Sequence, residues 1–292
     1  MRTVGTLKSL TLGSTKFSSR RLRRFRRALD RRARSIRFGI EREFPAVANV
    51  LYVREWLIFL RLWAYVRLFR VRWSQLELMF IHVPKTGGTS VSQVLRDEGA
   101  YETSHIRSLW ELARWGPAGG PRILKLGHLE SDVLVRSGLC DRDQLENVTS
   151  FAVVRDPFAR AWSAYRYVNS RPGRRLPRGA RFEDFVDYLL RKEYRCTLKG
   201  VFGLSHGWPQ VQWLVPRLWA GPSRIFCLEE SSKIEEFLGD FFGRRITLAH
   251  LNVGSGPAYP PEIFPRQEEF VEAFWPDFEF LEKNCGPLNA GP

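Results

Sequence analysis

The sequence predicts an α/β fold of three layers, in which a central and mostly parallel sheet is flanked by helices. Three short apolar runs, at residues 78–83, 149–154 and 224–228, each lead through a polar turn into a segment with helical character. Such alternation is typical of parallel sheets, because parallel neighbours need a long crossover between them. The composition, with 44% hydrophobic and 13% aromatic residues in a chain of 292, indicates a packed globular domain rather than a disordered chain.

The first strand leads into a loop that is suited to binding a phosphate. Residues 78–83 are apolar, and residues 84–90 combine Lys85 with the adjacent glycines Gly87 and Gly88 and three hydroxyl side chains. A helix that begins after such a loop presents unpaired backbone amides to an anion, and glycines let the backbone approach it closely. The order differs from that of a Walker A loop, where lysine follows the last glycine. We therefore expect an anion site here rather than an ATP site, the alternative being a tight turn with a solvated lysine.

A second anion site is predicted where the strand at residues 149–154 ends. Arg155 closes this strand, and Asp156 with Pro157 favours the start of a helix that carries Ser163. The carboxyl ends of parallel strands lie at one edge of a sheet, so both sites should lie on the same edge. Two such sites indicate a ligand with two separated anionic groups; the alternative is a solvated Arg155 beside a helix cap.

The remaining elements complete the expected alternation of strands and helices. We expect helices at residues 104–115, 130–147, 182–195, 231–242 and 266–275, a further helix that begins near 208, a strand at 123–128, and loops at 116–121, 171–180 and 250–257. The loop at 171–180 is strongly basic, and we expect it to be a lid or to face the substrate.

The net charge of the chain is concentrated near its beginning. Residues 1–75 hold 19 Lys/Arg and 4 Asp/Glu, which is the whole net charge of +15, whereas residues 76–292 hold 27 of each sign. We therefore divide the chain into a basic, amphipathic arm, residues 1–75, and a folded domain, residues 76–292. Within residues 16–73, arginines interrupt the apolar stretches too often for a membrane span. The arm is expected either to lie on an anionic membrane surface or to pack on the domain, and residues 16–43 could instead stay a solvated tail.

The four cysteines, Cys140, Cys196, Cys227 and Cys285, occur singly and far apart. No pair has the spacing of metal ligands, and four cysteines in a chain of this size do not suggest a disulfide framework. We therefore expect reduced cysteines, a reducing compartment and no metal site.

The two anion motifs resemble those of sulfotransferases that use 3′-phosphoadenosine-5′-phosphosulfate (PAPS). Residues 80–90, Phe-Ile-His-Val-Pro-Lys-Thr-Gly-Gly-Thr-Ser, resemble the family's 5′-phosphosulfate loop, and residues 151–165 resemble its 3′-phosphate motif. The first motif is similar to the glycosaminoglycan and polysaccharide branch. The resemblance covers about residues 76–285 and implies a P-loop-NTPase-like sulfotransferase fold, PAPS as the donor and no metal.

The resemblance also assigns roles to residues. Lys85 would bind the 5′-phosphate and stabilise the leaving oxygen, and Arg155 and Ser163 would hold the 3′-phosphate. The other residues of the 5′ cradle would be Thr86, Gly87, Gly88, Thr89 and Ser90. Preorganised cations and amides of this kind stabilise the charge that develops on a leaving phosphate.

A base must take the proton of the acceptor hydroxyl, and histidine suits this role at neutral pH. We expect His128, which follows the predicted strand at 123–128 in a Leu-Gly-His sequence that resembles carbohydrate sulfotransferases. If His128 is instead a structural cap, Glu130 or Asp132 could act, and His105 is a second choice. His82 lies within the first strand and is expected to be a core residue.

We therefore expect a sulfotransferase that transfers the sulfuryl group of PAPS by in-line displacement to a hydroxyl of a glycan or glycolipid. A small-molecule or protein tyrosine acceptor is the alternative within the family. Two alternatives from other classes are an ATP-dependent nucleotide kinase and a membrane- or nucleic-acid-binding protein with a vestigial nucleotide site. The absence of a clean span and of disulfide spacing favours a cytoplasmic enzyme, peripheral on a membrane, over one in the Golgi lumen. No specific nucleic acid partner is expected.

Overall fold

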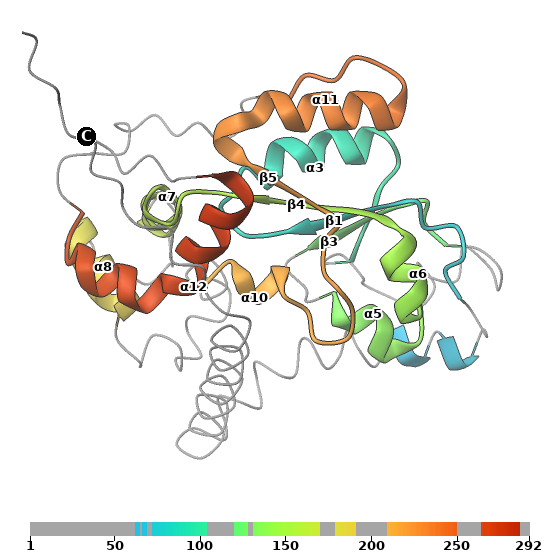
Figure 1. The fold of residues 1–292 in the computed structure, drawn as a ribbon, viewed down its shortest axis with the longest axis horizontal. Coiled ribbons are helices and arrows are strands. Elements are labelled where there is room, and N and C mark those ends of the chain that lie inside the picture. Colours follow the sequence, from blue (N-terminus) through green and yellow to red (C-terminus); the bar gives the residue numbers. More distant parts are fainter. Residues whose placement is uncertain are drawn as a thin grey trace, which may run out of the picture. The chain divides into compact units, whose positions relative to one another are not determined.

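A computed structural model describes most of the second of two compact units into which the chain divides, Asn49–Pro292. The described residues are 62–64, 66–68, 72–103, 120–127, 131–169, 179–190, 209–249 and 264–286. Their centre is a five-stranded sheet in the order β2-β3-β1-β4-β5, in which every neighbouring pair is parallel (Figure 1). The predicted fold class, a parallel sheet flanked by helices, is confirmed.

The strands are short, and the three central ones, β3, β1 and β4, are buried on both faces. They are β1 (Leu78–His82), β2 (Tyr101–Glu102), β3 (Ile123–Gly127), β4 (Thr149–Val154) and β5 (Arg224–Cys227). Along β1 the side chains of Leu78 and Phe80 enter one core cluster, and those of Met79 and Ile81 enter the other. Alternation between two apolar layers is the expected pattern of a parallel sheet that is covered on both sides.

Helices cover both faces of the sheet (Figure 1). Helices α3 (Gly88–Asp97) and α11 (Ser231–Phe242) pack on one face, and α5 (Asp132–Ser137), α6 (Arg142–Asn147) and α10 (Val211–Leu214) pack on the other. A third cluster of aromatic side chains joins α7 (Pro157–Asn169), α8 (Phe182–Leu190) and α12 (Gln267–Cys285). The 3-10 turn η5 (Leu228–Glu230) connects β5 to α11.

Several predicted elements match the structure, and others differ for local reasons. The segment 130–147 forms two helices, because Gly138 adopts a left-handed conformation (φ 79°) and Asp141 starts α6 with a capping box. The last helix does not end at residue 275 but continues through Pro276 to Cys285. Packing compensates for the proline, since Phe274 and Leu281 on either side of it are buried. The predicted helix at 104–115 and the basic loop at 171–178 lie outside the described residues.

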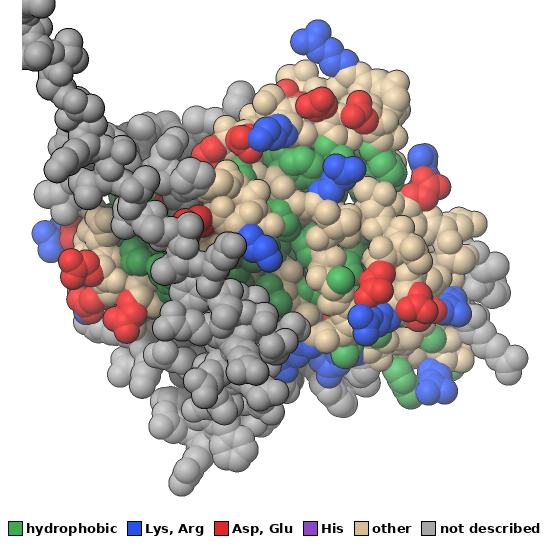
Figure 2. Space-filling view, in the orientation of Figure 1, with side chains coloured by type: hydrophobic (Ala, Val, Ile, Leu, Met, Phe, Trp, Pro, Cys, Tyr) green, Lys and Arg blue, Asp and Glu red, His purple; other side chains and the backbone are tan. Residues whose placement is uncertain are grey.

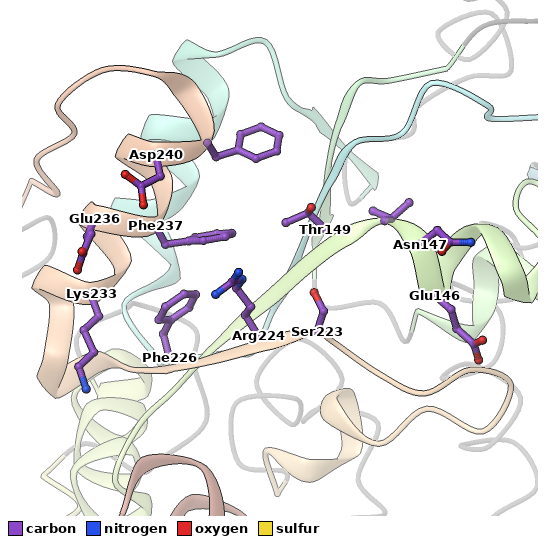
Figure 3. A pocket seen from close by; sticks show the side chains of 12 residues that line it. Glu146, Asn147, Thr149, Ser223, Arg224, Phe226, Lys233, Glu236, Phe237 and Asp240 are labelled. Atoms are coloured by element: carbon purple, nitrogen blue, oxygen red, sulfur yellow. The ribbon is translucent and has the colours of Figure 1, made fainter.

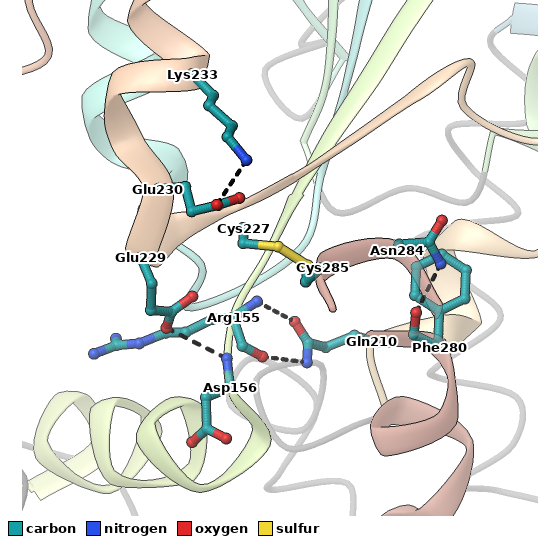
Figure 4. Close-up of a disulfide and its surroundings, with 10 residues drawn as sticks. All are labelled: Arg155, Asp156, Gln210, Cys227, Glu229, Glu230, Lys233, Phe280, Asn284 and Cys285. Carbon is teal, nitrogen blue, oxygen red and sulfur yellow. Dashed lines mark hydrogen bonds and ion pairs between the residues drawn. A yellow bond between two sulfur atoms is a disulfide. The ribbon is translucent and has the colours of Figure 1, made fainter. Parts of the chain in front are cut away.

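Cys227 and Cys285 form a disulfide, so the expectation of reduced cysteines is wrong for this pair. Their Cα atoms are 6.0 Å apart, and the bond joins the last residue of β5 to the last residue of α12 (Figure 4). Cys140 is buried and unbonded. The pairing carries no local signal in the sequence, because the two cysteines are separated by 58 residues and meet only in the fold.

The described part of the predicted arm contacts the domain. Leu62 is fully buried in the sheet's core, Val66 packs beside it, and the Trp73 amide donates to the Leu139 carbonyl (2.9 Å). Among the described residues no helix has the length and apolarity needed to cross a membrane. Residues 1–61 lie outside the description, so the division at residue 75 and the membrane contact stay predictions.

Candidate active site

The loop between β1 and α3 has the backbone conformation of an anion cradle. Lys85 (φ 69°) and Gly87 (φ 74°) both lie in the left-handed region, which turns the chain sharply into α3. Gly87 offers no side chain to accept from the first turn of α3, and the Ser90 amide donates to the Gly87 carbonyl (3.1 Å), so the amides of Gly88 and Thr89 are the ones suited to a ligand. The Thr86 side chain is buried, and its hydroxyl donates to the Val83 carbonyl (3.0 Å) within the loop.

Close packing requires glycine at position 88, and the left-handed backbone favours glycine at position 87. A Cβ atom on Gly87 would collide with the side chain of Leu228, and one on Gly88 would collide with the ring of His82. The His82 ring also stacks on Phe80, with ring centroids 5.4 Å apart, which agrees with its expected place in the core. The loop is therefore held tightly between β1 and the turn that follows β5.

The Lys85 side chain is directed toward α7. Its ammonium lies 4.1 Å from the centroid of the Tyr167 ring, at a distance typical of a cation–π contact. Ser163 lies four residues before Tyr167 on the same helix, so these two side chains share a helix face. The fold thus brings the Lys85 loop and the Ser163 face of α7 together, as the sequence predicted.

Arg155 is the first residue after β4, on the strand next to β1. Its Nε atom is buried and, among the described residues, has no hydrogen-bond partner. Burial lowers the pKa of Arg155, and the nearby carboxylates of Glu229 and Asp156 partly offset this effect. A cation that is desolvated and incompletely paired is suited to receive an anionic group of a ligand.

Two carboxylates accompany Arg155 (Figure 4). Asp156 caps α7, since its Oδ1 accepts from the Ala159 amide (2.7 Å), as the sequence predicted. Glu229 Oε1 accepts from the Asp156 amide (3.4 Å), and burial raises the pKa of Glu229 while Arg155 lowers it. A role for Glu229 at this site was not predicted from the sequence.

The structure narrows the choice of base. His128, Glu130 and His105 lie outside the described residues. Asp132 lies within the described residues. It is buried, and its carboxylate accepts hydrogen bonds from the backbone amides of Arg217 (2.9 Å) and Leu218 (3.1 Å). The alternative in which Asp132 acts as base is therefore contradicted by its structural role.

An open cavity of about 810 Å³ lies at the opposite end of the strands, where β4 and β5 begin (Figure 3). Its lining includes Thr149 and Arg224, the first residues of β4 and β5, together with Phe237 and Asp240 of α11. Ligands of open parallel sheets bind beyond the carboxyl ends of the strands, so this cavity is not the expected position of the donor. Within the described ranges no group of acidic, histidine or cysteine side chains could hold a metal ion.

Comparisons with known proteins identify the family. A family profile described as "Sulfotransferase family" matches residues 71–219, about half of the chain. No curated protein matches the sequence. A crystal structure of mouse sulfotransferase SULT7A1 complexed with PAP is similar at 14% identity and a TM-score of 0.38, covering 77% of this chain and 89% of that chain. On the family match, which includes the β1 loop and the end of β4, the chain belongs to the sulfotransferase family, whose members take the sulfuryl group from PAPS.

Proposed function

We propose that this sulfotransferase transfers the sulfuryl group of PAPS to a hydroxyl of a glycan or glycolipid. The family match supports sulfotransferase chemistry and favours it over the nucleotide-kinase alternative. The acceptor class rests on the sequence of the β1 loop, which resembles the carbohydrate branch. Positive and negative side chains are interspersed over the described part of the face in Figure 2. The surface charge of this face therefore gives no support for a polyanionic acceptor.

The observation that carries the donor assignment is the buried Nε of Arg155 at the end of β4, for which the described part of the chain provides no hydrogen-bond partner. A guanidinium can bind a terminal phosphate through two parallel hydrogen bonds, and its desolvation cost is recovered when the anion arrives. The uncapped first turn of α3 lies after the neighbouring strand, β1. Two anion sites on adjacent strands fit a donor that carries phosphate groups at both its 3′ and 5′ positions.

The proposed chemistry needs charge stabilisation at the 5′ end of the donor. When bound, the donor supplies the sulfuryl group, and negative charge develops on the bridging oxygen as that group leaves. Lys85 would stabilise this charge together with the amides of Gly87, Gly88 and Thr89. The Tyr167 ring would hold the ammonium of Lys85 in the loop before the donor binds. Positioning the acceptor in line with the leaving group would supply much of the remaining acceleration.

His128 remains our proposed base. Gly127, the last residue of β3, is in register with His82 at the end of β1, so these two strands end side by side. His128 follows Gly127 in the sequence, and its imidazole could accept the acceptor's proton near neutral pH.

We also propose that the basic arm contacts an anionic membrane surface. Beyond the net charge of residues 1–75, the described helical residues support this: Trp63 is 42% exposed and Leu68 is 69% exposed. The guanidinium of Arg67 lies 5.6 Å from the Trp63 ring centroid. Aromatic and basic side chains together are typical of helices at the headgroup level of a bilayer.

Calorimetry with 3′,5′-bisphosphoadenosine (PAP) tests the donor site. Replacement of Arg155 by alanine should weaken binding by roughly 1–3 kcal/mol, through the loss of charge-assisted hydrogen bonds. Lys85→Met should lower kcat for sulfuryl transfer more than it lowers PAP affinity, because its charge acts mainly on the leaving group. Arg142→Ala is the matched control, since this arginine is exposed on α6. Unchanged PAP binding in Arg155→Ala would overturn the donor assignment.

A transfer screen tests the acceptor. Labelled PAPS is offered with glycans, glycolipids, small phenols and tyrosine peptides, using the full chain and the Lys85→Met variant as a background control. We expect transfer to a carbohydrate hydroxyl, whereas transfer only to phenols or tyrosine would replace the acceptor class without affecting the donor site.

A further inference from the structure

The main chain of Arg155 is held by the side chain of Gln210 (Figure 4). The Arg155 amide donates to Gln210 Oε1 (3.0 Å), and Gln210 Nε2 donates to the Arg155 carbonyl (2.8 Å). Val154, the last residue of β4, is paired with Cys227, the last residue of β5. Arg155 follows Val154 directly. The side-chain amide of Gln210 therefore continues the hydrogen bonding of β4 by one residue, to the residue that carries the guanidinium.

Gln210 is itself fixed by Asp277 of α12. Both residues are fully buried, and the carboxylate of Asp277 accepts from the amides of Gln210 (2.8 Å) and Val211 (3.0 Å). Burial raises the pKa of Asp277, and the charge of Arg160 and these hydrogen bonds lower it. A buried carboxylate that accepts two backbone amides is costly to displace, so it holds Gln210 in one position.

The same group of residues reaches the loop of Lys85. Arg160 is 4% exposed, lies on α7, and donates from its Nε to the carbonyl of Pro84 (2.9 Å), directly before Lys85. The buried polar side chains of Gln210, Asp277 and Arg160 thus connect the segment that carries Arg155 to the segment that carries Lys85. This connection is formed by parts of the chain as far apart as β1 and α12.

We propose that Gln210 is a positioning residue for the donor's 3′-phosphate, acting through Arg155. This inference rests on the proposed function, in which Arg155 binds that phosphate. Two hydrogen bonds set the direction of the Arg155 backbone and hence the point from which its guanidinium extends. Displacement of that backbone should weaken contacts to the 3′-phosphate and leave the 5′ site on β1 intact.

The experiment compares two nucleotides in variants of the full chain. PAP carries both phosphates, whereas adenosine 5′-monophosphate lacks the 3′-phosphate and reports on the 5′ site alone. Gln210→Met keeps the length of the side chain and removes both hydrogen bonds to Arg155. We expect it to weaken PAP binding about tenfold and to change the affinity for the monophosphate by less than about twofold. Gln212→Met is the matched control, because Gln212 is exposed on the same short helix, and it should change neither affinity.

Two further measurements separate positioning from a general loss of structure. In an Arg155→Ala background, Gln210→Met should cause no additional loss of PAP affinity, because both changes act on one interaction. In Gln210→Glu, a protonated carboxyl can again donate a hydrogen bond to the Arg155 carbonyl. The PAP affinity of this variant, relative to that of the wild type, should therefore recover as pH falls. Burial favours this protonated form.

The possible outcomes are distinct. A parallel loss of affinity for both nucleotides in Gln210→Met, additive losses in the double variant, or an unchanged PAP affinity would overturn the role of Gln210. If Gln210→Met does not fold, the pH-dependent recovery of Gln210→Glu decides, and no recovery would refute the proposal. A wild-type protein that binds PAP no more tightly than the monophosphate would overturn the proposed function and this inference with it.

Discussion

Reduction of the Cys227–Cys285 disulfide should destabilise the fold by a large and calculable amount. The bond closes a loop of 58 residues between β5 and the end of α12. In the chain-entropy model, opening a loop of this length costs roughly 4 kcal/mol of stability at 25 °C, because the unfolded chain regains conformational freedom. Typical domains are stable by only about 5–15 kcal/mol, so a loss of this size should lower Tm by roughly 8–16 °C.

Urea denaturation followed by tryptophan fluorescence measures this effect with and without a thiol reductant. Because the bond constrains the unfolded chain, reduction should lower the free energy of unfolding and raise the m-value. The Cys227→Ala/Cys285→Ala variant is the control: it should resemble the reduced protein, and reductant should not change it further. The PAP affinity of the reduced but folded protein should stay within about twofold of the oxidised value.

Two results would refute this reasoning. If reduction changes the free energy of unfolding by less than about 1 kcal/mol, the bond does not constrain the unfolded chain as argued. If the double-cysteine variant loses stability on reduction as much as the wild type does, the effect comes from another thiol. Peptide mapping of the oxidised protein provides the direct check, and it should recover the Cys227 and Cys285 peptides joined.

Two further predictions concern the donor site and the arm. An anion bound at Arg155 should raise the pKa of Glu229 further above its ordinary value of 4.5, so PAP affinity should fall as pH rises from the free-state to the bound-state pKa. Glu229→Gln should remove this dependence in a calorimetric pH series, and identical profiles in both proteins would contradict it. The full chain should co-sediment with phosphatidylserine vesicles and less so as salt increases, while Trp63→Ser/Leu68→Ser weakens binding. Equal binding to neutral phosphatidylcholine vesicles would argue against an electrostatic membrane contact.

Local patterns were sufficient to predict the elements that carry the two motifs. The bounds of β4 and α11 agree with the prediction, and β1 ends one residue before the predicted end of its strand. In each case an apolar run of strand length is followed by a helix-starting residue, so the signal is contained within a few positions. The residues brought to the carboxyl edge, Lys85 and Arg155, could be predicted because parallel strands place such junctions side by side.

The supporting interactions could not be predicted, because their partners are distant in sequence. Gln210 and Asp277 are 67 residues apart and meet through packing of α10 and α12. The continuation of α12 through Pro276 also depends on this packing, since local propensity predicts that a helix ends before proline. The hydrogen bond of the Thr86 hydroxyl to the Val83 carbonyl, which satisfies a buried acceptor within the loop, was likewise not predicted.

In this site, one part of the chain provides the charged groups and another part holds them in position. The sheet supplies Lys85 and Arg155 from neighbouring strands, where their spacing follows from the parallel register. Alignment would depend on Asp277, which lies on the last described helix and accepts from the backbone amide of Gln210, the residue whose side chain pairs with Arg155. A donor with two phosphates demands that both anion sites stay correctly spaced, and a strand end alone is free to fray. The side-chain amide of Gln210, held by the buried carboxylate of Asp277, would meet this demand, so under the proposed role of Gln210 helix α12 would support donor binding although it carries none of the family motifs.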